Sequence, residues 1–149
     1  MTNRISLAFK TLKPLPLNNM YSQTKTGRRF KSKKAVEFEN RMTCELIRKK
    51  HEMFKFEIDT SVFEHFLTCK IVCELPRSKL ITKKGTVNTK SGDVDNFCKP
   101  IIDNIFKFMD KLDDSIILQV DVCKRFSQDN NYNIYVEFTR REIIELDDL

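Results

Sequence analysis

The sequence predicts an α+β fold in which two helices pack on a small mixed β-sheet, with elements in the order β-α-β-α-β-β. Two segments carry apolar residues at helical spacing, and four others alternate apolar with polar residues. Turn-forming residues separate these segments. A chain of 149 residues is long enough for one hydrophobic core. We therefore predict a single domain over residues 1–149, with an acidic tail over about residues 140–149.

The N-terminal part of the chain predicts a strand, a loop and a helix. Residues 5–12 are expected to form the strand, which the prolines that follow would end. Residues 17–31 contain turn-forming residues and predict the loop. Ser32 is a suitable N-cap for a helix from residue 33 to about residue 51. The residues of this helix that should face the core are Ala35, Phe38, Met42 and Leu46.

The middle of the chain predicts a second strand and a long loop. Residues 54–59 are ambiguous between a helix and a strand. Residues 62–75 alternate and predict a strand that Pro76 ends. One face of this strand should carry Leu67, Cys69, Ile71 and Cys73. Residues 77–92 predict a basic loop, and a loop of this length in a small domain is usually functional or disordered.

The C-terminal part predicts a second helix and two more strands. The helix is expected from residue 93 to about residue 111. Its apolar stripe comprises Phe97, Ile101, Ile105, Phe108 and Leu112. Strands are expected over residues 116–124 and 133–138. The short polar turn between these two strands indicates a hairpin.

The five cysteines do not form a recognisable disulfide or zinc pattern, because their number is odd and no Cys-x-x-Cys pair occurs. His65, Cys69 and Cys73 recur at every fourth residue, but they lie on a predicted strand. Positions four apart on a strand are roughly 13 Å apart. One zinc ion, with bonds of about 2.3 Å to sulfur, cannot span that distance. We therefore expect small buried thiols there.

Basic residues are concentrated in two stretches of a chain whose formal net charge is +6. The first acidic residue is Glu37, and a second stretch without acids runs over residues 77–90. Clustered basic charge is typical of a nucleic-acid-binding protein, although a lysine-rich surface is often only a solvated face. The candidate DNA-binding residues are Arg28, Arg29, Lys31, Lys83, Lys84 and Lys124.

Membrane insertion and secretion are not indicated. No apolar run approaches the roughly 20 residues that a membrane helix needs. The N-terminal residues do not have the pattern of a signal peptide. We therefore expect a cytoplasmic protein without a membrane partner.

Acidic residues gather at both ends of the second predicted helix. Asp93 and Asp95 lie where the loop becomes a helix, and Lys99 shares a helix face with Asp95. Asp113 and Asp114 follow the end of this helix. Carboxylates bind Mg²⁺, and a lysine beside the metal can stabilise charge that develops on a phosphate. Three aspartates and a lysine are therefore sufficient for metal-dependent phosphodiester cleavage.

Each of these acids also has a purely structural interpretation. An aspartate at a helix start can be an N-cap. Asp95 and Lys99 can form a surface ion pair, which contributes little to stability. Asp113 and Asp114 can be ordinary turn residues.

The segment Asp93–Asp103 resembles the Asp-x-Asp-Asn-x-x-Lys-x-x-x-Asp signature of RusA-type Holliday junction resolvases. The similarity continues in register at the end of the helix and near the N-terminus. The other similar segments are residues 16–21, 27–29, 112–117 and 122–124. The resemblance covers about residues 5–138.

The resemblance implies a RusA-like fold and a homodimeric nuclease that nicks four-way DNA junctions in recombination and repair, often encoded by a prophage. It implies that Mg²⁺ is the cofactor, with Mn²⁺ as a possible substitute. Asp93, Asp95 and Asp114 match the metal-binding aspartates of the family, and Lys99 matches its essential lysine. Asp113 is the weaker candidate of its pair. The basic stretch over residues 77–92 and the acidic tail depart from the family pattern.

Two other functions compete with a nuclease. The first is a non-catalytic DNA-binding or regulatory module that uses the basic stretches without cutting. The second is a phosphatase or nucleotidase with an Asp-x-Asp motif, but such motifs usually end a buried apolar strand. Here Lys90, Ser91 and Gly92 precede the motif, which argues against that class.

Overall fold

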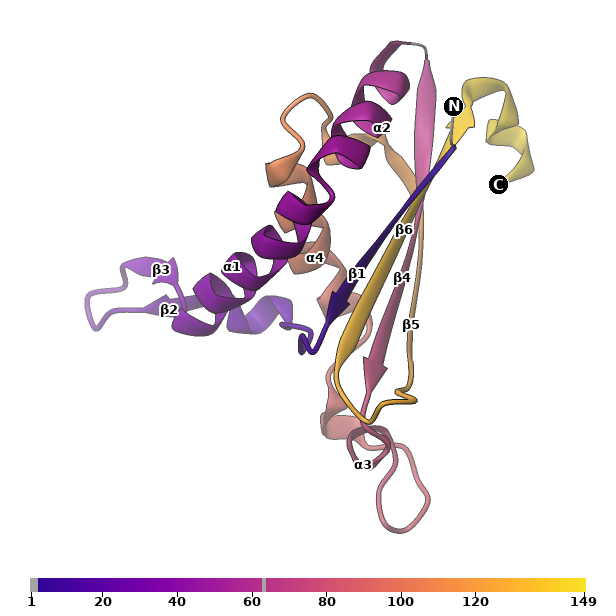
Figure 1. The fold of residues 1–149 in the computed structure, drawn as a ribbon. Helices are drawn as coiled ribbons and strands as arrows, with labels where there is room; N and C mark the ends of the chain where they lie inside the picture. Colours follow the sequence, from indigo (N-terminus) through magenta and orange to yellow (C-terminus); the bar gives the residue numbers. More distant parts are fainter. Residues whose placement is uncertain (1–2, 63) are drawn as a thin grey trace.

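The computed structural model describes residues 3–62 and 64–149, and its main feature is a four-stranded mixed sheet (Figure 1). The strands are β1 (Arg4–Lys10), β4 (His65–Leu75), β5 (Ile117–Phe126) and β6 (Asn133–Glu142). Their order across the sheet is β1-β6-β4-β5. Strand β6 is antiparallel to both of its neighbours, whereas β4 and β5 are parallel. The predicted α+β class is confirmed.

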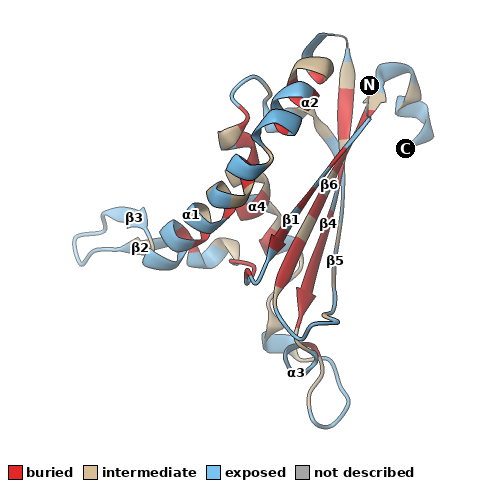
Figure 2. Ribbon diagram, in the orientation of Figure 1, coloured by how far each residue is buried: buried red, intermediate tan, exposed pale blue. Residues whose placement is uncertain are grey.

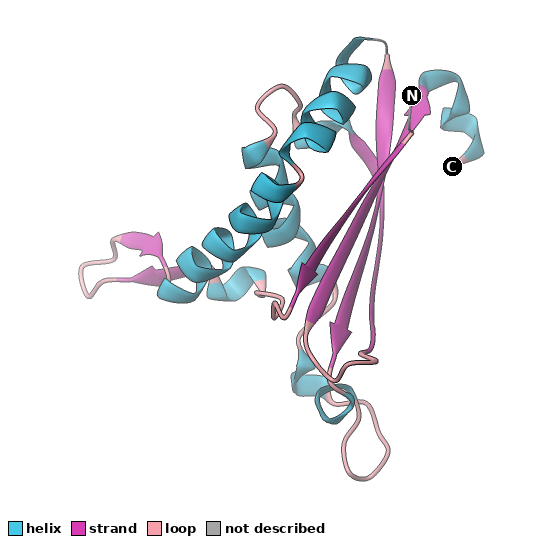
Figure 3. Ribbon diagram, viewed as in Figure 1, coloured by secondary structure: helices cyan, strands magenta, loops and turns pink. Residues whose placement is uncertain are grey.

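Three long helices lie on one face of this sheet (Figure 3). They are α1 (Lys33–Arg48), α2 (Lys50–Val62) and α4 (Asp95–Phe108). Their apolar side chains form one core cluster with those of the strands, and Met42, Leu46, Ile101, Ile71 and Phe138 are completely buried at its centre. Figure 2 shows the buried stripes of the helices turned toward the sheet. The helices therefore cover the face on which the core lies.

Local sequence signals explain why α1 begins and packs where it does. The Ser32 hydroxyl accepts a hydrogen bond from the backbone N–H of Ala35 at 3.1 Å, as an N-cap does. The four residues predicted to face the core from this helix are all buried. The predicted inward face of β4 is also buried, so these predictions are confirmed.

The structure contains more regular elements than the sequence indicated. The ambiguous residues 54–59 belong to α2, which makes three long helices instead of two. The predicted loop over residues 17–31 contains a hairpin of β2 (Tyr21–Gln23) and β3 (Arg29–Lys31), which projects from the body (Figure 1). Three-residue strands are too short to show alternation, so periodicity did not reveal them.

Smaller elements also lie in segments predicted as irregular or as tail. The basic segment 77–92 contains α3 (Arg77–Leu80), a bridge between Ile81 and Val87, and a short 3-10 turn. Strand β6 continues to Glu142, so residues 140–142 are strand and not tail. Ile143–Asp148 form a 3-10 turn after it. Phe63, which falls within the predicted second strand, lies outside the described residues, and β4 starts at His65.

The predicted hairpin of the last two strands is wrong, because β4 lies between β5 and β6. The segment after β5 instead passes the end of β4, where the backbone N–H of Ser127 bonds the carbonyl of Leu75 at 2.9 Å. Alternation shows that a segment is a strand, but it does not show which strand is its neighbour. The central strand β4 is apolar enough to pair on both sides, since nearly all of its residues are buried or half-buried.

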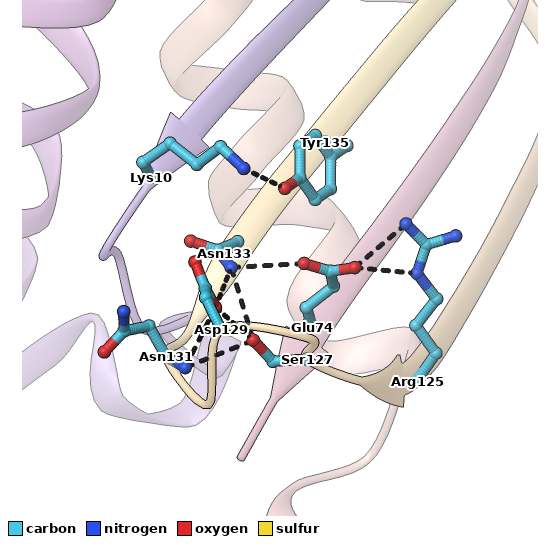
Figure 4. Close-up of polar contacts among 8 residues, drawn as sticks. All are labelled: Lys10, Glu74, Arg125, Ser127, Asp129, Asn131, Asn133 and Tyr135. Carbon is cyan, nitrogen blue, oxygen red and sulfur yellow. Dashed lines mark hydrogen bonds and ion pairs between the residues drawn. The ribbon is translucent and has the colours of Figure 1, made fainter.

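A polar network holds this crossing in place (Figure 4). The buried Asn133 donates from its amide to Glu74 at 3.1 Å and to Asp129 at 3.0 Å. Arg125 bonds the other oxygen of Glu74 through Nε and Nη2, at 3.0 and 2.9 Å. Hydrogen bonds from Ser127, and from the Asn131 backbone and the Asn133 amide, lower the pKa of Asp129 to about 2. The network ties β4, β5 and β6 together at one end of the sheet.

Candidate active site

An open depression of about 280 Å³ lies between helix α4 and the start of β5. Asp95 and Lys99 enter it from the first turns of α4, and Asp114 enters it from the 3-10 turn Asp114–Ile116 before β5. Asp103 completes the polar lining. The other lining residues are Cys98, Ile102, Ile117 and Val120. The fold therefore brings together residues from both ends of the α4 crossover.

Asp93 is placed differently from the other predicted metal-binding residues. It is exposed, lies two residues before α4, and does not line the depression. Its backbone carbonyl accepts a hydrogen bond from the N–H of Asn96 at 3.0 Å, which turns the chain into the helix. Two of the three predicted metal-binding aspartates therefore share the depression, and the third lies beside the same helix start.

The structure excludes the two structural interpretations of Asp95. The N-cap position of α4 is Val94, and no side chain caps it. Lys99 does not pair with Asp95 but with Asp103, at 3.0 Å between Nζ and Oδ2. Within residues 3–62 and 64–149, the carboxylates of Asp93 and Asp95 make no hydrogen bond and no ion pair. Both groups are thus available to an external ligand.

The neighbouring acids Asp113 and Asp114 have different surroundings. Asp113 accepts a hydrogen bond from the Ser115 backbone N–H at 2.9 Å and caps the short turn, and this bond lowers the pKa of its carboxyl group. Asp114 lines the depression, and the pKa of its carboxyl group is raised, first by the hydrogen bond that it shares with Asp113. Asp113 therefore serves the local backbone, and Asp114 faces the site.

Lys99 is held in the depression by its ion pair. The hydrogen bond and the negative charge of Asp103 raise the pKa of the Lys99 ammonium group, so this group stays charged at neutral pH. Its side chain is 61% exposed, which leaves donor hydrogens for a phosphate. Asp103 thus orients a positive charge next to Asp95 and Asp114.

Lys124 and Gly92 fix the segment that leads into α4, a role that periodicity and charge did not reveal. Lys124 Nζ donates to the Gly92 carbonyl at 2.6 Å and to the Ser91 hydroxyl at 2.7 Å. Gly92 has a φ of +95°, and a Cβ atom there would lie 2.7 Å from the ring of the buried Phe97. The Gly-Asp-x-Asp sequence was the available signal, because a positive φ favours glycine.

The other basic candidates lie on two separate projections (Figure 1). Arg28 and Arg29 are on the β2–β3 hairpin, where the Arg29 guanidinium stacks over the Tyr21 ring at 4.1 Å. Lys31 follows them but pairs with Glu39 at 2.7 Å. Lys83 and Lys84 are exposed in the turn that the Ile81–Val87 bridge closes. Among the basic candidates, those without an ion pair in the described residues are thus on the hairpin and on this turn.

The donor set of the depression matches a hard divalent cation. Among the described residues, no three His, Cys, Asp or Glu side chains are arranged to hold a metal ion. Mg²⁺, however, is usually held by one or two carboxylates together with water and substrate phosphates. The free Asp95 and the nearby Asp114 supply two such oxygen donors.

Cys69 and Cys73 are buried as predicted, and burial raises the pKa of each thiol to about 12.

Comparison with known proteins gives one family. A family model described as endodeoxyribonuclease RusA matches residues 11–138, which is most of the chain. No curated protein matches the chain.

Among the described residues, none of the helices has the length and apolar character needed to cross a membrane.

Proposed function

The chain belongs to the RusA family of endodeoxyribonucleases, and from this premise we propose that it resolves four-way DNA junctions by paired, Mg²⁺-dependent nicks. The observation that carries the proposal is the depression beside α4. There the carboxylate of Asp95, which has no partner in the described part of the chain, lines the same depression as Asp114 and the cation of Lys99. Such a reaction would serve DNA recombination and repair, and we place it in the cytoplasm and within a single nuclease domain.

Each residue of the depression has a proposed part in phosphodiester cleavage. Asp95 and Asp114 would hold the metal, with Asp93 as a third ligand from the adjacent segment. A bound divalent ion supplies an activated water and neutralises charge on the phosphate, and Mn²⁺ would substitute for Mg²⁺. Lys99 would direct its ammonium group at a phosphate oxygen or at the leaving oxygen. Asp103 is a positioning residue, because it touches Lys99.

The two basic projections would bind the DNA backbone. Arg28 and Arg29 are the strongest candidates, because both lie on the projecting hairpin and neither forms an ion pair among the described residues. Lys83 and Lys84 would act as helpers from the other projection. Lys31 contributes less free charge because it pairs with Glu39, which it shares with Lys107. Lys124 would act mainly by holding Gly92.

Replacing both Arg28 and Arg29 with Ala is expected to weaken junction binding and its salt dependence together. Each lost phosphate contact lowers the slope of log affinity against log salt by nearly one, so the double variant should lose about two. The measurement is a binding titration of a labelled junction at several salt concentrations. A double variant of Lys50 and Lys55, which are exposed on α2 and lie outside both basic stretches, is the control with the same charge. An unchanged slope in the arginine variant would show that the hairpin does not contact phosphates.

Paired nicks require two active sites, and a four-way junction has approximate two-fold symmetry. A two-fold homodimer presents two identical sites at a fixed separation, which is the simplest arrangement that fits this symmetry. We therefore propose that the active form is a homodimer.

The central test of the proposed function is metal dependence on branched DNA. Labelled four-way junctions are incubated with the protein in Mg²⁺, in Mn²⁺ and in EDTA, and a linear duplex of the same sequence is the control. We expect paired nicks on the junction with either metal, none in EDTA, and no comparable cutting of the duplex. Junction binding without nicks under every condition would instead identify a non-catalytic DNA-binding module.

A further inference from the structure

Strand β5 is an open edge of the sheet (Figure 1). It is ten residues long and, within residues 3–62 and 64–149, pairs only with β4, so that part of the chain offers no partner strand to the backbone N–H and C=O groups on its other side. The opposite edge, β1, has α1 and α2 packed against it. Most of β5 is exposed (Figure 2). A long, accessible edge is a template for pairing with another strand.

The two cationic side chains of β5, Lys124 and Arg125, bond groups of the same chain and are not spread along its open edge. Leu118, Val120 and Phe126 are 48%, 42% and 43% exposed. Edge strands are normally kept apart by lysines, prolines or short length. The single lysine of this strand, Lys124, turns away to bond Ser91 and Gly92. The strand therefore presents apolar residues next to unpaired backbone groups.

We propose that β5 pairs antiparallel with β5 of a second copy of this chain, about a two-fold axis at Cys123. The inference rests on the dimer of the proposed function and names the surface that forms it. In this register Val120 lies opposite Phe126 of the second copy, and Asp121 lies opposite Arg125. Two apolar pairs and two ion pairs then form, one of each on either side of the axis.

The charges of β5 select this register. The Asp121 carboxylate has no hydrogen-bond or ion-pair partner in the part of the chain that the structure describes. Arg125 uses Nε and Nη2 for Glu74, yet its side chain is 56% exposed and keeps N–H donors for a second carboxylate. Moving the axis to Val122 leaves Asp121 opposite a cysteine. Moving it to Lys124 leaves Asp121 opposite Ser127, beyond the end of the strand, so the ion pairs are lost.

The pairing has a consequence for the proposed active sites. A two-fold axis between two antiparallel edge strands is perpendicular to the joined sheet, so the helices of both copies lie on the same face. Ile117 and Val120 of β5 line the depression that holds Asp95 and Asp114. The two depressions would therefore flank the new strand pair and face the same DNA molecule.

Disulfide trapping tests the register directly. Residues that are directly opposite in an antiparallel pair have Cα atoms about 4.5–5.5 Å apart, within the range of a disulfide. Cys123 is free and exposed. We expect diamide to convert the protein into a covalent dimer, and we expect Cys123→Ser to abolish this product. Cys44→Ser removes the other exposed thiol, on α1, and should leave the product unchanged.

A charge reversal tests the ion pairs without relying on cysteine chemistry. Asp121→Arg sets two arginines against each other at each end of the pair, and we expect the dimer dissociation constant in sedimentation to rise on the order of a hundredfold. Asp110→Arg makes the same charge change at an exposed residue after α4, and it should dissociate like the wild type. Circular dichroism of both variants checks that they fold.

Three results would overturn the proposal. The first is a protein that stays monomeric at micromolar concentration, and the second is a dimer that Asp121→Arg does not weaken. The third is a covalent dimer that forms in the double variant Cys123→Ser with Val122→Cys, while the wild type forms none through Cys123. None of these measurements uses DNA or metal. A dimer that forms through another surface and still nicks junctions would contradict this interface and leave the proposed function standing. A β5-paired dimer that cannot cut would do the reverse.

Discussion

Asp95→Asn protein is expected to bind four-way junctions with wild-type affinity and to nick them at a rate reduced on the order of a hundredfold or more. A metal supplies several kcal/mol of transition-state stabilisation, and each 1.36 kcal/mol is a factor of ten in rate. A neutral amide weakens metal binding without adding repulsion toward phosphates. Asp95 has no internal partner among the described residues, so the substitution should cost only the helix-dipole interaction of its charge, about 0.3–1 kcal/mol.

The measurement compares single-turnover nicking rates and binding curves for the same labelled junction. Asp110→Asn removes an equivalent exposed charge outside the depression, and it should cut at the wild-type rate. Raising the Mg²⁺ or Mn²⁺ concentration should restore part of the activity of Asp95→Asn if the lost group is a metal ligand. Wild-type nicking by Asp95→Asn protein would remove Asp95 from the site.

Gly92→Ala is expected to lower the free energy of unfolding by about 2–6 kcal/mol and to impair cutting as well. A non-glycine residue at φ +95° costs about 1–3 kcal/mol in backbone strain. The added Cβ would lie 2.7 Å from the Phe97 ring, and crowding of this kind costs about another 1–3 kcal/mol. Phe97 is 2% exposed and belongs to the core cluster, so its ring is enclosed by packed neighbours. Relief of the clash must therefore shift Asp93 and Asp95, which follow directly.

Gly85→Ala separates the two contributions. Gly85 also has a positive φ, +82°, but nothing lies within 4 Å of the position that its Cβ would take. This variant should show the backbone cost alone, in chemical denaturation with an unchanged dependence on denaturant. Equal losses of stability in the two variants would show that the contact with Phe97 has no energetic role.

Local patterns in the sequence predicted local structure well. The Ser32 cap and the buried face of α1 follow from residue type and helical spacing alone, and the structure confirms both. Alternation also identified the strands of the main sheet. Their order was not predictable, because an apolar central strand such as β4 accepts a neighbour on either side. The hairpin prediction for β5 and β6 failed for this reason.

The candidate site shows the same division between local and long-range information. Spacing along one helix placed Asp95 and Lys99 on a common face, and the structure has both of them in the depression. The pairing of Lys99 with Asp103, and the contact of Lys124 with Gly92, depend on side-chain geometry that spacing does not encode. The metal-binding roles of Asp93, Asp95 and Asp114 stay predictions until the variants are measured.

The position of β6 in the sheet has a consequence for how the protein folds. Strand β6 lies between β1 and β4, and its register joins Arg4 to Thr139 and Lys10 to Asn133. Until β6 docks, β1 has no neighbouring strand among the described residues, and only β4 and β5 can pair with each other. Contacts between residues so far apart in the chain give a high contact order, which slows folding. We therefore expect refolding to be limited by closure of β6, with the first and last strands of the sheet protected from hydrogen exchange at the same time.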